Sequence, residues 1–98
     1  MLNKLVGRWK TDSRDKKTIE DFGNVTLEFL DDGQLTYIIH EKGKDQKMFL
    51  TYRIQGDTLI TNQPSKPKEE ETKFKFTSDA ELSLYFGGEE SRYVKVVD

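Results

Sequence analysis

The fold of this protein is decided by residues 25–54, which read VTLEFLDDGQLTYIIHEKGKDQKMFLTYRI. Apolar and polar residues alternate in three runs within this stretch, at 25–30, 34–41 and 46–54. Strict alternation over such short runs is typical of strands that bury one face and expose the other. The stretch therefore predicts three antiparallel strands joined by two hairpins.

The first hairpin loop is Asp31-Asp32-Gly33. A three-residue loop that ends in glycine suits a type I turn followed by a left-handed residue, and Gly33 takes that position. The loop length places Phe29 opposite Leu35, so that turn chemistry and apolar pattern agree. A slip of one residue would turn every apolar row toward water.

The second loop, Lys42-Gly43-Lys44-Asp45, is predicted to have four residues. It places Tyr37 opposite Leu50 on the inner face. The same register places Ile38 opposite Phe49 on the outer face. These two apolar residues form an acceptable cross-strand pair. With Leu30 and Ile60 nearby, they also make a candidate patch for a partner or a second copy, which suggests a monomer or a weak homodimer.

The rest of the chain extends this pattern. Further strands are predicted at residues 4–11, 58–62, 69–77, 82–86 and 90–97. Residues 12–23 favour equally a short helix capped by Asp12 or Ser13, or a plain loop. Residues 63–68 contain both prolines and are predicted to form a long loop at one barrel end. About eight short strands in a meander avoid bare edges by closing, so we expect an all-β, antiparallel up-and-down β-barrel in one domain, 1–98.

Composition excludes several classes of partner. The 98 residues carry 18 acidic and 16 basic side chains, so the net charge of −2 gives no reason to expect binding to nucleic acid or an anionic membrane. No stretch approaches the ~18 apolar residues of a membrane span. The N-terminus lacks the apolar run of a signal peptide. A full-length chain would be cytoplasmic, and one whose signal peptide had been removed would be secreted or periplasmic.

The residues Leu5-Val6-Gly7-Arg8-Trp9-Lys10 resemble the Gly-x-Trp opening of lipocalins and fatty-acid-binding proteins. The motifs that follow are similar to those of small bacterial lipocalin-like domains: Leu-Glu-Phe, Asp-Asp-Gly, Leu-Thr-Tyr and Tyr-x-Ile-x-Gly-Asp-Thr-Leu. The resemblance implies a lipocalin-like barrel in which an arginine near the chain end packs across Trp9. One face of the last strand would bury Lys95, so we expect the other face, with Arg92, to point inward. That orientation agrees with the resemblance, because it brings Arg92 within reach of Trp9. Arg92 and Tyr93 are adjacent, unlike the spaced Arg-x-Tyr pair of fatty-acid-binding proteins, so fatty-acid binding is not implied.

No catalytic or metal-binding pattern is present in the sequence. It contains no nucleophile elbow, phosphate loop or dinucleotide fingerprint, and no histidine is placed to activate a serine. One histidine, His40, and no cysteine cannot build a histidine or thiolate metal site. We therefore expect neither an enzyme nor a cofactor.

The inner face offers a candidate binding site. Tyr37 and Tyr52 are either core aromatics whose hydroxyls reach backbone or barrel mouth, or polar handles in an apolar pocket. The other bulky side chains expected inside predict a mostly filled interior with at most a small pocket near this pair; they are Trp9, Phe29, Met48, Phe74, Phe76 and Phe86. The expected function is a non-catalytic domain that binds a small apolar or amphipathic molecule, with Trp9, Tyr37, Tyr52 and Arg92 as candidate site residues. The alternative is a protein-interaction or inhibitor module that uses the outer face or the 63–68 loop.

Overall fold

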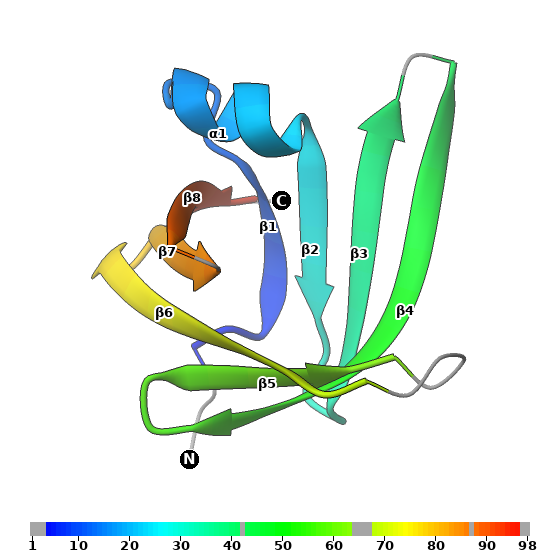
Figure 1. Cartoon of the computed structure of the whole chain (residues 1–98), viewed down its shortest axis with the longest axis vertical. Coiled ribbons are helices and arrows are strands. Elements are labelled where there is room, and N and C mark those ends of the chain that lie inside the picture. Colours follow the sequence, from blue (N-terminus) through cyan, green and yellow to red (C-terminus); the bar gives the residue numbers. More distant parts are fainter. Residues whose placement is uncertain (1–3, 42, 64–67, 87, 97–98) are drawn as a thin grey trace.

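Eight antiparallel strands follow one another around a closed barrel in the computed structural model, which describes residues 4–41, 43–63, 68–86 and 88–96 (Figure 1). The strands are β1 (Gly7–Thr11), β2 (Val25–Phe29), β3 (Gln34–Glu41), β4 (Lys44–Gln55), β5 (Thr58–Asn62), β6 (Glu70–Ser78), β7 (Glu81–Phe86) and β8 (Glu89–Lys95). Each strand pairs with the next, and β8 returns to pair with β1. The predicted up-and-down barrel is confirmed.

The hairpin of β2 and β3 has the predicted register. Phe29 lies opposite Leu35, and Leu27 lies opposite Tyr37. Gly33 in the connecting loop has φ of 89°, a left-handed value that glycine adopts without steric cost. Leu27, Phe29 and Leu35 are buried in the barrel core.

The hairpin of β3 and β4 differs from the predicted register by two residues. Tyr37 lies opposite Met48 rather than Leu50, because both strands continue to the pair formed by Glu41 and Lys44. A shift of two residues leaves every side chain on its predicted face, since side chains alternate with a period of two. It does separate the predicted outer pair, as the next subsection describes.

Residues 12–23 contain a helix, α1 (Lys16–Phe22), which decides between the two alternatives left by the sequence. Its N-cap is Asp15, whose side chain accepts a hydrogen bond from the backbone of Thr18 at 3.4 Å. The predicted caps were therefore wrong: Asp12 instead bonds the backbone and guanidinium of Arg14. With seven residues, α1 is too short to cross a membrane, and no long apolar helix occurs elsewhere in the described residues.

The helix also covers an edge of β8. Strand β1 pairs with β8 as far as Thr11, and the next backbone amide, of Asp12, donates to the carbonyl of Arg92 at 2.9 Å. Beyond Thr11, β1 no longer pairs with β8. There the hydroxyl of the buried Thr18 accepts a hydrogen bond from the Arg92 N–H at 3.0 Å. The helix thus supplies a hydrogen bond where a neighbouring strand would otherwise do so.

The last strand faces opposite to the prediction. Arg92 points outward, where its side chain is 54% exposed and lies 3.7 Å from Asp15. Tyr93 is only 2% exposed and belongs to the core. The prediction failed because it treated Lys95 as a mid-strand residue, whereas Lys95 is the last residue of β8. At that end a lysine can bury its stem and keep its ammonium group near the surface.

Lys95, rather than Arg92, packs across Trp9. The two residues are cross-strand partners, and the Lys95 ammonium lies 5.5 Å from the centroid of the Trp9 ring. Gly7 allows this approach, because a Cβ atom there would stand 3.1 Å from Cε of Lys95. The cation–aromatic contact implied by the family resemblance is therefore present, but a different residue makes it.

The interior around Trp9 is filled with side chains. Trp9 is fully buried, and its indole N–H donates to the carbonyl of Leu5 at 3.0 Å. Its ring centroid is 5.9 Å from that of Phe76, which in turn lies 5.8 Å from Phe74. We call this group, with Leu82, the filled part of the barrel.

Candidate functional site

The remainder of the interior is hollow. It encloses a cavity of about 500 Å³, within the ~300–1,000 Å³ typical of small-molecule sites. Most of its lining side chains are apolar or carry a single hydroxyl. They include Leu27, Phe29, Leu35, Tyr37, Met48, Leu50, Leu59, Thr61, Thr72, Leu84, Ser91 and Tyr93.

The cavity is larger than the sequence predicted, for two reasons. Trp9, Phe74 and Phe76 gather in the filled part and leave the rest of the barrel to smaller side chains. Met48, expected inside, is 37% exposed because β4 extends beyond its pairing with β5. The side chain of Phe86, also expected inside, lies outside those described.

The cavity reaches the surface beside β4. This strand has twelve residues, but β5 pairs with it only from Thr51 to Gln55. Among the described residues, its first half, residues 44–50, is paired with β3 alone (Figure 1). The cavity residues next to this free edge are Met48 and Leu50 on one side and Gln63, Lys68 and Glu70 on the other. We call this opening the portal.

The polar groups of the cavity wall include the phenols of Tyr37 and Tyr93 and the hydroxyls of Ser91, Thr61 and Thr72. Ser91 lies two residues from Tyr93 on the same face of β8, and both line the cavity. Burial raises the pKa of Tyr93 to about 12, although the hydroxyl of Ser91 opposes this; the charge that Tyr37 would carry raises it further. Burial also raises the pKa of Tyr37. Both phenols are therefore neutral near pH 7 and able to donate hydrogen bonds.

The structure places the candidate site residues predicted from the sequence in different environments. Tyr37 lines the cavity. Tyr52 does not: its hydroxyl donates to the carbonyl of Leu30 at 2.6 Å, and its ring meets Phe29 edge-on at 5.1 Å. The core interpretation therefore holds for Tyr52. Trp9 is buried in the filled part, and Arg92 lies outside the barrel.

Sequence reasoning missed Tyr93 and Ser91. Both were assigned outward because Arg92, between them, was assigned inward. The signal that would have found them is the alternation of residues 91, 93 and 95, once a lysine at a strand end is accepted as a partner for the opening tryptophan.

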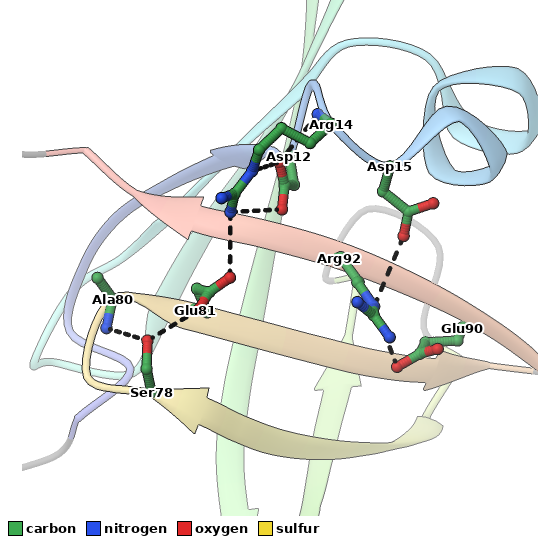
Figure 2. Close-up of polar contacts among 8 residues, drawn as sticks. All are labelled: Asp12, Arg14, Asp15, Ser78, Ala80, Glu81, Glu90 and Arg92. Atoms are coloured by element: carbon green, nitrogen blue, oxygen red, sulfur yellow. Dashed lines mark hydrogen bonds and ion pairs between the residues drawn. The ribbon is translucent and has the colours of Figure 1, made fainter.

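The outer face beside α1 carries charged side chains in compensated groups (Figure 2). The Arg14 guanidinium bonds both oxygens of Asp12 and also Glu81 at 3.1 Å. The hydrogen bond from Arg14 lowers the pKa of the Asp12 carboxyl, although burial opposes this. Arg92 lies between Asp15 and Glu90 (Figure 2). Each of these two guanidinium groups thus faces two carboxylates.

His40 is also engaged at the surface. Its Nδ1 lies 3.0 Å from a carboxylate oxygen of Asp45, and its Nε2 lies 2.7 Å from the hydroxyl of Thr26. Within the described ranges, no three acidic or histidine side chains gather closely enough to hold a metal ion.

The predicted outer patch is smaller than expected. Phe49 is 67% exposed, but it lies opposite Thr36, while Ile38 lies opposite Lys47. Ile60 is buried at 2% exposure and adds nothing to an exposed patch. Phe49 is therefore the one residue of the expected patch that is mostly exposed.

Comparison with known proteins supports the fold. No protein-family model matches the sequence, and a search of curated proteins found no match. A search of solved structures found a lipocalin-like protein from Bacteroides uniformis ATCC 8492 with a TM-score of 0.70 and 18% sequence identity. The match covers 96% of this chain and 100% of that one. At this level of identity the likeness concerns the fold, and the chain has a lipocalin-like, closed antiparallel β-barrel.

Proposed function

We propose that the protein is a non-catalytic binding domain that holds a small apolar or amphipathic molecule inside its barrel. The observation that carries this proposal is the apolar cavity of about 500 Å³, which reaches the surface at the portal. Pockets that bind small molecules are mostly apolar, with a few polar groups that fix orientation. The leucines of β2 to β5 and β7 supply such walls, and Tyr37, Ser91 and Tyr93 supply such groups.

The size of the cavity favours compact ligands. The cavity occupies only part of the barrel, because Trp9 and Phe76 pack together in the filled part and do not line it. An extended chain would therefore have to remain partly in the portal. We expect a compact aromatic molecule to bind at micromolar strength, about −8 kcal/mol. Long-chain fatty acids should bind more weakly.

The test is a titration of naphthalene and 2-acetylnaphthalene into the full chain, followed by calorimetry. Thr72→Phe places a ring in the cavity wall, and Thr77→Phe places the same ring on the exposed outer side of the same strand. Thr72→Phe should weaken binding at least tenfold, while Thr77→Phe should leave it unchanged. Equal binding by both variants, or no saturable binding by the unaltered chain, would contradict the proposal.

A second candidate function is protein interaction through the outer face of β3 and β4. The exposure of Phe49 favours it, because a large apolar side chain at 67% exposure loses contact with water when a partner covers it. Sedimentation velocity at increasing concentration tests the simplest case, a homodimer. The unaltered chain should associate and Phe49→Thr should not. If the unaltered chain and Phe49→Thr both sediment as monomers, the exposure of Phe49 no longer favours a homodimer.

A further inference from the structure

The two phenols of the cavity come from strands on different sides of the barrel. Tyr37 belongs to β3 and Tyr93 to β8, and each faces the hollow interior. They lie close enough for one to influence the ionisation of the other. Tyr93 has the hydroxyl of Ser91 beside it on β8, whereas in the described part of the chain the Tyr37 hydroxyl has no hydrogen-bond partner. A ligand oxygen in the cavity would give it one.

Charged groups lie at the rim of the cavity rather than in its wall. Among the described lining residues, the charged ones are Lys68 and Glu70, both at the portal. The Lys68 ammonium lies 3.8 Å from a Glu70 carboxylate oxygen, so the two charges offset one another. Lys95, on the inward row of β8, is placed over Trp9 and does not line the cavity. A carboxylate carried into the cavity would therefore lose its hydration without gaining a counter-charge, which is costly.

From these two observations we infer that the cavity selects neutral ligands with a hydrogen-bonding oxygen, such as a ketone, ester or alcohol, over ligands with a carboxylate. Tyr37 is the main specificity residue, because its free hydroxyl donates to the ligand oxygen. Tyr93 and Ser91 provide the second polar contact. This inference rests on the proposed function and adds the chemistry of the ligand's polar group to it.

The experiment uses three probes that share one ring system: naphthalene, 2-acetylnaphthalene and 2-naphthoate, titrated calorimetrically into the full chain at pH 7. One added hydrogen bond should make the ketone bind about fivefold tighter than the hydrocarbon. The carboxylate should bind at least tenfold more weakly than the ketone. Tyr37→Phe should abolish the advantage of the ketone over naphthalene. Tyr85→Phe is the matched control, because Tyr85 is exposed and does not line the cavity.

The outcomes separate this inference from the proposed function. If naphthalene binds but the ketone has no advantage, or if 2-naphthoate binds as well as the ketone, the cavity binds molecules without the selection inferred here. If Tyr37→Phe weakens ketone and hydrocarbon equally, Tyr37 acts through the shape of the cavity, and the inference is overturned. If none of the three probes binds to the unaltered chain, the proposed function fails and the inference fails with it.

Discussion

The hydrogen bond from the Arg92 amide to Thr18 should make a measurable contribution to stability. Thr18 is fully buried, and its hydroxyl accepts the backbone N–H of Arg92 at 3.0 Å. Thr18→Val keeps the shape of the side chain and replaces the hydroxyl by a methyl group. The Arg92 N–H then has no acceptor at the edge of β8 that α1 covers.

The magnitude follows from two opposing effects. An amide left without a partner away from water costs about 1–3 kcal/mol. The added methyl group returns up to ~0.8 kcal/mol through burial, and valine and threonine have similar helix propensities. Thr18→Val should therefore lower the free energy of unfolding by about 1 kcal/mol. For a domain of this size, that corresponds to a fall in Tm of about 4–8 °C.

Two measurements check the prediction. Urea denaturation gives the change in the free energy of unfolding, and amide hydrogen exchange followed by NMR locates it. The Arg92 amide should exchange faster in Thr18→Val than in Thr18→Ser, which retains the hydroxyl. Thr77→Val, on the exposed face of β6, is the matched control and should change stability by less than about 0.5 kcal/mol.

Hydrogen exchange also gives the outcome that would refute the reasoning. If Thr18→Val lost stability while the Arg92 amide remained fully protected, the loss would come from packing and not from this hydrogen bond. If neither quantity changed, the helix would not stabilise the edge of β8 in the way described.

Three further predictions concern single residues, each measured by chemical denaturation. Lys95→Met keeps the stem but removes the charge over Trp9, and should cost about 0.5–2 kcal/mol; a variant as stable as the unaltered chain would contradict the cation–π contact. Because Arg14 lowers the pKa of Asp12 in the folded state, Asp12 stabilises the fold fully above its unfolded pKa of about 3.9. That contribution is lost as the pH falls through the lower folded value, so Asp12→Asn should show a shallower loss of stability below about pH 4; a parallel pH profile would argue against it. Gly33→Val should cost about 1–2 kcal/mol because φ at this position is 89°; no loss would mean that the turn can rearrange.

The two hairpins show what a strand pattern can and cannot predict. The loop ending in Gly33 has one favourable geometry, so the pairing of Phe29 with Leu35 could be predicted. The loop around Gly43 is flanked by polar residues on both sides, and closing it two residues tighter exposes nothing apolar. Alternation has a period of two, so it predicts which face a residue occupies but cannot detect a shift of two in its partner.

The last strand and the cavity show a different limit. Whether Lys95 is costly to bury depends on its distance from the strand end, and the sequence does not state where a strand ends. For this reason the predicted site contained Arg92, whereas the cavity is lined by Tyr93. The volume of the cavity depends on where bulky side chains gather, and their number in the sequence does not determine that distribution.

The division of the barrel into a filled and a hollow part has a consequence for how such proteins diverge. Around Trp9 each side chain supports several others, so replacements there threaten the fold. Thr61, Thr72 and Ser91 border empty space, and a change in their size alters the shape of the cavity more than it alters the core. Selection for a new ligand can therefore act on one set of positions while selection for folding acts on another. A barrel that shares only 18% of its residues with this chain keeps the same architecture.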